Sequence, residues 1–181
     1  MNQSVSESIN MRLFVAIRFT DTFKKALSRV MQELKIQGAQ GNFTPVERLH
    51  LTLCFIGETE KLSEIKIALQ GISFSPFMLQ LSEIGRFRDL LWIGTDENPL
   101  LNQLVQEIRT ALAKTGIPFD RKTFKTHITL VRRADEQIFK KAERLQIPQA
   151  DMQVAFISLM NSSHINGKLT YTELLRIPAN S

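Results

Sequence analysis

The same four-residue pattern occurs twice in the chain, as HLTL at positions 50–53 and as HITL at positions 127–130. Both copies read histidine, aliphatic, threonine, leucine, and both lie in short runs of alternating polar and apolar residues. Such alternation is typical of a β-strand that buries one face. A repeated strand of this kind predicts a fold with two similar halves, each built on antiparallel strands.

Strand geometry determines what each copy presents. Side chains two residues apart project from the same face of a strand, so His50 lies beside Thr52 and His127 beside Thr129. The opposite faces are expected to enter a core, formed by Leu49, Leu51, Leu53 and Phe55 in the first copy and by Ile128 and Leu130 in the second. Each copy therefore offers one imidazole and one hydroxyl on a rigid platform.

The remaining sequence predicts alternating strands and helices. Glycine, proline and asparagine mark the boundaries, Thr20 is an expected helix N-cap, Gly57 an expected strand end, and Asn166-Gly167 an expected hairpin turn. The expected strands cover residues 12–19, 48–55, 77–85, 90–95, 127–132, 152–160 and 168–177, and the expected helices cover 20–35, 61–70, 98–114 and 136–145.

This order predicts an α+β fold of two pseudo-symmetric lobes, each a small antiparallel-rich sheet with helices on its outside and with a cleft between the lobes. Residues 1–10 are polar and without pattern, which predicts a loose tail. Residues 11–181 are then expected to form one bilobal domain, because a chain of 181 residues is long for one domain but short for two.

The composition is close to the average of soluble folded proteins. A hydrophobic fraction of 43% and a charged fraction of 23% exclude a mainly disordered or collagen-like chain, and apolar runs of only about five residues indicate no membrane helix. The single cysteine, Cys54, forms no internal disulfide, and the first residues lack signal-peptide character, so a cytoplasmic protein is expected. A net charge of +5 favours polyanionic partners, and residues 117–126 form a basic, irregular connection.

Two imidazoles facing one another are suited to acid–base chemistry at a phosphate. Near neutral pH one ring accepts a proton while the other donates one, and threonine hydroxyls with an arginine hold the anionic oxygens. Ordinary strand packing explains a single His-x-Thr, but it explains the duplicated pattern less well. Zinc binding is disfavoured because Cys54 and His164 lack ligand-like spacing, so neither a metal nor a cofactor is expected.

Several motifs together make the chain resemble the RNA 2′,3′-cyclic phosphodiesterases, also called 2′-5′ RNA ligases, of the two-histidine phosphoesterase superfamily. The resemblance covers residues 11–177. It rests on MRLFVAI at the start, PVERLHLTLCFIGE around the first histidine, IGRF followed by LLWIG, KTFKTHITLVR around the second histidine, and a closing pattern of Ser162, Gly167, Tyr171 and Leu174.

The resemblance implies metal-independent hydrolysis of RNA 2′,3′-cyclic phosphate ends to 2′-phosphate ends, with reversible 2′-5′ ligation as a further reaction. It implies that His50 is the proton donor and His127 the proton acceptor, and that Thr52 and Thr129 bind phosphate. The implied substrate is RNA or a nucleotide with a cyclic phosphate, and the protein is expected to be a monomer.

Three further residues follow from the same resemblance. Arg132 matches a phosphate-contacting arginine, although strict alternation places it opposite His127, so this role requires a bulge or a strand end. Phe124 matches a base-stacking position, with core packing as the alternative. Phe43 stands where the family often has tryptophan, so it offers a smaller surface to a base.

Two alternatives remain open from the sequence. The protein is a related phosphodiesterase acting on 2′-5′ oligoadenylates or small cyclic nucleotides, or it is a noncatalytic RNA-binding module that kept the cleft. Retention of both histidines argues against the second alternative.

Overall fold

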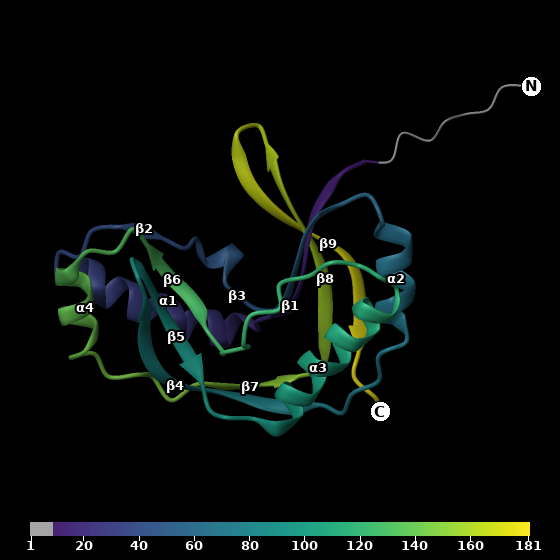
Figure 1. Cartoon of the computed structure of the whole chain (residues 1–181). Coiled ribbons are helices and arrows are strands. Elements are labelled where there is room, and N and C mark those ends of the chain that lie inside the picture. The colour runs from purple at the N-terminus through teal and green to yellow at the C-terminus, as the bar shows by residue number, and fades with distance from the viewer. Residues whose placement is uncertain (1–8) are drawn as a thin grey trace, which may run out of the picture.

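The strands form two antiparallel sheets in a computed structural model that describes residues 9–181 (Figure 1). One sheet has the strand order β3-β1-β8-β9, and the other has the order β2-β6-β5-β4-β7. The strands are Met11–Arg18 (β1), Asn42–Phe43 (β2), His50–Thr59 (β3), Phe77–Phe87 (β4), Leu90–Thr95 (β5), Ile128–Arg132 (β6), Asp151–Val154 (β7), Phe156–Ile165 (β8) and Lys168–Pro178 (β9). The tail expected over residues 1–10 falls mainly on residues 1–8, which lie outside the described residues, while Ile9 and Asn10 are exposed.

Two helices accompany each sheet. The helices are Asp21–Ile36 (α1), Leu62–Gln70 (α2), Pro99–Lys114 (α3) and Glu136–Ala142 (α4), with a short 3-10 turn at Val46–Arg48. α2 packs beside α3 next to the four-stranded sheet, and α1 packs beside α4 next to the five-stranded sheet (Figure 1). The expected α+β class with two sheet-and-helix lobes is therefore confirmed.

Local capping explains where the helices begin. The hydroxyl of Thr20 accepts from the backbone N–H of Phe23 at 3.3 Å, as the sequence predicts for α1. Asn98 caps α3 in the same way, by accepting from the N–H groups of Leu100 and Leu101. These caps fix the ends of the helices that follow β1 and β5.

The two sheets do not correspond to the two halves of the sequence. β1 and β3 lie in one sheet with the C-terminal strands β8 and β9, through the pairing of β1 with β8, whereas the central strands β4 and β5 lie in the other sheet with β6 and β7. The single strand expected over residues 152–160 is wrong, because Ala155 separates β7 and β8, which belong to different sheets. The buried residues change phase there, from Met152 and Val154 to Ile157 and Leu159.

Bulges change the faces of β3. Val15 pairs with Cys54 and Ala16 with Thr52, so Leu53 is an extra residue that shifts the alternation. Phe55 therefore does not enter the main core as expected; it is half-buried on the same side as Thr52. The strand also continues past Gly57, the expected end, because this glycine adopts a φ of 91° and bends the chain instead of stopping it.

One large buried core joins the two lobes. Leu13, Ile17 and Leu51 from the four-stranded sheet belong to the same cluster as Ile93 and Ile128 from the five-stranded sheet.

The hairpin turn expected between the last two strands, β8 and β9, is confirmed, with positive φ values of 51° and 75° in Asn166-Gly167. Within residues 9–181, no helix is long and apolar enough to cross a lipid bilayer.

Candidate active site

The first motif lies where β3 begins, and its histidine is held by the 3-10 turn that precedes the strand. The Nδ1 atom of His50 lies 2.7 Å from the carbonyl oxygen of Arg48. A carbonyl only accepts, so Nδ1 carries a hydrogen and Nε2 is left for chemistry. Nε2 lies 3.0 Å from the hydroxyl oxygen of Thr52, which confirms that the two side chains share a face.

The second motif repeats this arrangement at the start of β6. The Nδ1 atom of His127 donates to the carbonyl oxygen of Lys125 at 2.8 Å, again two residues earlier in the chain. In both histidines Nδ1 is held by a backbone carbonyl, so Nε2 is the nitrogen turned to the neighbouring space. Both bonds use a backbone carbonyl, so the side chains at Arg48 and Lys125 do not signal them in the sequence.

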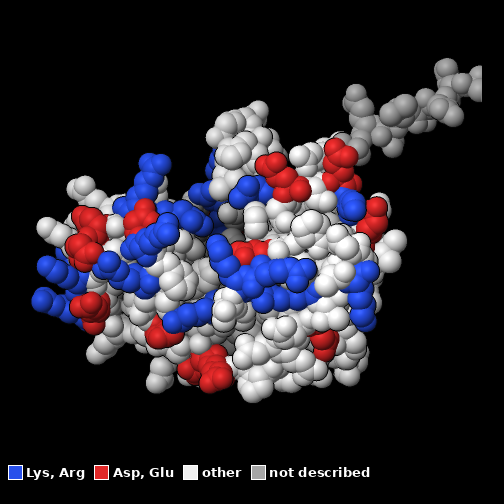
Figure 2. All heavy atoms as spheres, viewed as in Figure 1, with Lys and Arg blue, Asp and Glu red and all other residues white. Residues whose placement is uncertain are grey.

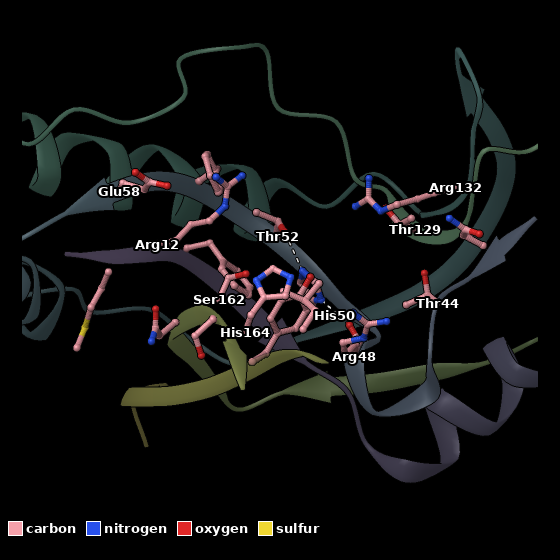
Figure 3. A pocket seen from close by; sticks show the side chains of 18 of the residues that line it. Arg12, Thr44, Arg48, His50, Thr52, Glu58, Thr129, Arg132, Ser162 and His164 are labelled. Atoms are coloured by element: carbon pink, nitrogen blue, oxygen red, sulfur yellow. Dashed lines mark hydrogen bonds between the residues drawn. The ribbon is translucent and has the colours of Figure 1, made fainter. Parts of the chain in front are cut away.

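Both motifs face one cleft of about 1080 Å³ between the two sheets. His50 and Thr52 line it from the four-stranded sheet, and His127 and Thr129 line it from the five-stranded sheet. Figure 3 shows Thr52, Thr129, Arg132 and His50 around this space. Two segments far apart in the chain thus meet at one site, as the duplicated pattern predicts.

Arg132 reaches the cleft because β6 contains a bulge. Leu91 pairs with Val131 while its neighbour Trp92 pairs with Thr129, so Leu130 is an extra residue. Val131 is therefore buried and Arg132 is exposed into the cleft, on the same side as His127. The bulge that the sequence required for this arginine is present.

Two aromatic rings surround the first histidine. The His50 ring lies 5.1 Å from the ring of Phe14 and 5.3 Å from that of Tyr171, which it meets edge-on. Burial lowers the pKa of His50 below its usual 6.5, the hydrogen bond to the Arg48 carbonyl opposes this shift, and the charges of Arg132 and His127 lower the pKa further. His50 is therefore mainly uncharged at neutral pH in the free protein.

The second histidine has a more open setting. Its ring lies 5.3 Å from that of Phe87, which also packs against the buried Trp92 at 5.0 Å. A second cavity of about 550 Å³ adjoins the cleft and shares Thr52, Phe55 and His127 with it. The site is thus asymmetric, with one enclosed and one accessible imidazole.

The two candidate stacking residues occupy different places. Phe43 lines the main cleft, and the ammonium nitrogen of Lys35 lies 4.7 Å from the centre of its ring. Phe124 lines the second cavity and not the main cleft, and it also packs against the core. The sequence did not predict Arg48, Tyr171 and Phe14 as parts of the site. Tyr171 and Phe14 reach it through long-range strand pairing, whereas Arg48 lies beside it in the 3-10 turn just before His50.

Positive charge dominates this part of the surface. Figure 2 shows Lys and Arg side chains in a band across the middle of the molecule, over the connection between α3 and β6. Arg121, Lys122 and Lys125 are exposed in that connection. No group of three histidine, cysteine or acidic side chains within residues 9–181 is arranged to hold a metal ion. Cys54 is buried, and burial raises the pKa of its thiol to about 11, so it is no nucleophile.

Similarity to known proteins agrees with this geometry. The sequence is 34% identical over 130 residues to the RNA 2′,3′-cyclic phosphodiesterase of Archaeoglobus fulgidus, which covers 67% of this chain and 72% of that protein. It is 28% identical to the enzyme of the same name from Thermotoga maritima, over 84% of this chain and 87% of that protein.

The fold is also found in a solved structure. Escherichia coli LigT complexed with 3′-AMP superposes with a TM-score of 0.80 at 28% identity, covering 95% of this chain and 99% of LigT. The family model of the 2′-5′ RNA ligase superfamily matches residues 23–165. With both histidine motifs inside the matched region, the chain belongs to the 2′-5′ RNA ligase superfamily.

Proposed function

We propose that the protein hydrolyses RNA 2′,3′-cyclic phosphate ends to 2′-phosphate ends. The observation that carries this proposal is the convergence of two histidine–threonine pairs on one cleft, each histidine with Nε2 as its reactive nitrogen. The activity named for the relatives from Archaeoglobus and Thermotoga supports the same reaction.

In this reaction His127 is the general base and His50 the general acid. The Nε2 atom of His127 takes a proton from water, the water oxygen forms a bond to phosphorus, and the bond from phosphorus to the 3′ oxygen breaks. His50 delivers a proton from Nε2 to that oxygen, and the phosphate stays on the 2′ oxygen. Each transfer contributes about 10²–10⁴ in rate.

The hydroxyls of Thr52 and Thr129 and the guanidinium of Arg132 bind the nonbridging oxygens, where charge increases in the transition state. A bound anion also changes the protonation state of His50. Its lowered pKa makes the ring uncharged in the free protein, but a phosphate beside it favours the imidazolium and so loads the acid when substrate arrives.

The proposal also covers base binding, cofactor use, oligomeric state and cellular location. Phe43 and Phe124 are candidates for stacking on a base. The reaction uses no metal and no cofactor, and residues 11–181 act as one domain in a monomer. A cytoplasmic location suits a chain whose single cysteine forms no internal disulfide.

The test uses a nucleoside 2′,3′-cyclic phosphate with identification of the product. The wild type should form the 2′-phosphate isomer at the same rate with and without EDTA. His50→Ala and His127→Ala should each lower kcat by about 10²–10⁴, while binding of a nucleoside 2′-phosphate changes little. Formation of the 3′-phosphate isomer, or loss of activity with EDTA, would contradict the proposal.

A second candidate reaction is 2′-5′ ligation, in which the 5′ hydroxyl of another RNA replaces water. The second cavity beside His127 favours it, because this space adjoins the proposed base, where the attacking oxygen enters. Incubating a cyclic phosphate end with a 5′-hydroxyl oligonucleotide and analysing the linkage distinguishes ligation from hydrolysis alone. A binding module without catalysis would give neither product.

A further inference from the structure

The main cleft extends well beyond the two histidines, along the four-stranded sheet. Arg18 pairs with His50 and Ala16 with Thr52, and further along β1 the same face reaches Arg12. Arg12 lies four residues from Ala16, or about 13 Å at a strand rise of ~3.3 Å per residue. On this face of β1 and β3, Thr52, Phe14 and Arg12 border the same cleft, and the small Ala16 does not.

Several polar side chains line this far part, and we name three of them the outer row: Arg12, Ser162 and His164. Arg12 pairs with Ser162 across β1 and β8, and His164 follows two residues later, so strand geometry places the three on one face. Figure 3 shows all three at the cleft, with Arg12 and Ser162 beyond Thr52 as seen from Thr129. His164 is exposed near the end of β8 and borders this cleft.

The guanidinium of Arg12 is available to a ligand. Its carbon lies 4.9 Å from the centre of the Phe55 ring, which holds the side chain by a cation–π contact. Its strand neighbour Glu58 is the acidic residue that lines the cleft, yet no ion pair joins the two in the described part of the chain. Arg12 is thus oriented but not neutralised.

The direction of the proposed reaction relates the outer row to the substrate. His50 protonates the 3′ oxygen, so the terminal ribose lies on the side of the four-stranded sheet that carries His50. The attacking water enters beside His127, on the opposite side. Nucleotides that precede the terminal ribose therefore continue over the four-stranded sheet, where the outer row lies.

We propose that the outer row binds the ribose–phosphate backbone of the nucleotides that precede the cyclic end, so that the enzyme prefers an RNA oligonucleotide over a single nucleotide. This inference rests on the proposed function. Arginine binds a phosphate through two parallel hydrogen bonds, the Ser162 hydroxyl adds a donor, and the His164 ring adds a donor or acceptor for phosphate or ribose. Phosphate contacts fix position without reading sequence, so little base preference is expected from this row.

The test compares a trinucleotide with a 2′,3′-cyclic phosphate end and the corresponding mononucleotide. The wild type should have the higher kcat/KM for the trinucleotide. Arg12→Ala should lower the ratio of the two kcat/KM values about tenfold, as expected when one charge-assisted hydrogen bond to phosphate is removed. The salt dependence of trinucleotide kcat/KM should weaken by ~0.7 in logarithmic slope for each phosphate that the variant no longer neutralises.

Matched variants separate this effect from damage to the fold. Arg12→Gln keeps a polar, hydrogen-bonding side chain without the charge and should lower the ratio as Arg12→Ala does, and His164→Ala should lower it less. Arg29→Ala removes an exposed arginine on α1 outside the cleft and should leave the ratio unchanged.

The outcomes distinguish this inference from the proposed function. If the wild type hydrolyses neither substrate, the proposed function fails. If it hydrolyses both and the Arg12 variants leave the ratio at the wild-type value, the reaction stands and the outer row binds no RNA backbone.

Discussion

Thr52→Val tests whether the hydroxyl beside the first histidine acts on the reacting phosphate. Valine suits a β-strand and fills nearly the same space, so the change removes the hydroxyl and little else. In the free protein this oxygen lies 3.0 Å from Nε2 of His50. A hydrogen bond to a charged group contributes about 1.5–3 kcal/mol, which corresponds to a loss of ~10- to 100-fold in kcat/KM.

The assay is steady-state hydrolysis of a nucleoside 2′,3′-cyclic phosphate, with thermal unfolding measured in parallel. Thr52→Ser restores the hydroxyl and should recover most of the rate. Thr172→Val, at an exposed position of β9, provides the matched control and should leave kcat/KM unchanged. A wild-type kcat/KM for Thr52→Val would refute the phosphate-binding role, because the hydroxyl would then serve only to pack against the ring.

Three other predictions concern the scaffold. Gly85→Ala should lower the Tm by about 2–12 °C, since a Cβ there overlaps the buried Trp92 ring, at a cost of ~1–3 kcal/mol; Gly71→Ala, whose Cβ meets nothing closer than 3.6 Å, should not lower it. Burial lowers the pKa of His50 in the folded protein, so as the pH falls the unfolded chain takes up a proton at this residue before the folded protein does. The contribution of His50 to the free energy of unfolding is therefore complete above pH 6.5 and decreases as the pH falls from 6.5 towards the folded pKa. His50→Gln should make this decrease smaller in urea titrations. Urea unfolding should show one transition with coincident fluorescence and circular dichroism, because both sheets share one core, and two separated transitions would contradict this.

Local rules predict much of this fold and of its site. Alternation placed His50 beside Thr52, the Thr20 cap marked the start of the first helix, and Asn166-Gly167 predicted the hairpin. These features depend on residues that are close in the chain. They are therefore readable without knowledge of the tertiary partners.

The features that the sequence did not predict depend on strand partners. Leu53 is extra only relative to β1, so nothing local shows that Phe55 changes face. Ala155 separates two strands because the residues before it pair with β4 and the residues after it pair with β1. The change in the phase of burial from Val154 to Ile157 is the local sign of this break. The aromatic contact of Tyr171 with His50 likewise arises from pairing across β8 and β9.

The acid and base roles of the two histidines are tested most directly with sulfur in place of the 3′ oxygen of a nucleoside 2′,3′-cyclic phosphate. A thiolate leaves without a proton, because a thiol has a pKa near 8.5. We expect that His50→Ala, impaired by about 10²–10⁴ on the oxygen substrate, regains most of this rate on the sulfur substrate, whereas His127→Ala remains impaired. Recovery of His127→Ala instead would reverse the roles, and full activity of both variants on the oxygen substrate would contradict a two-histidine mechanism.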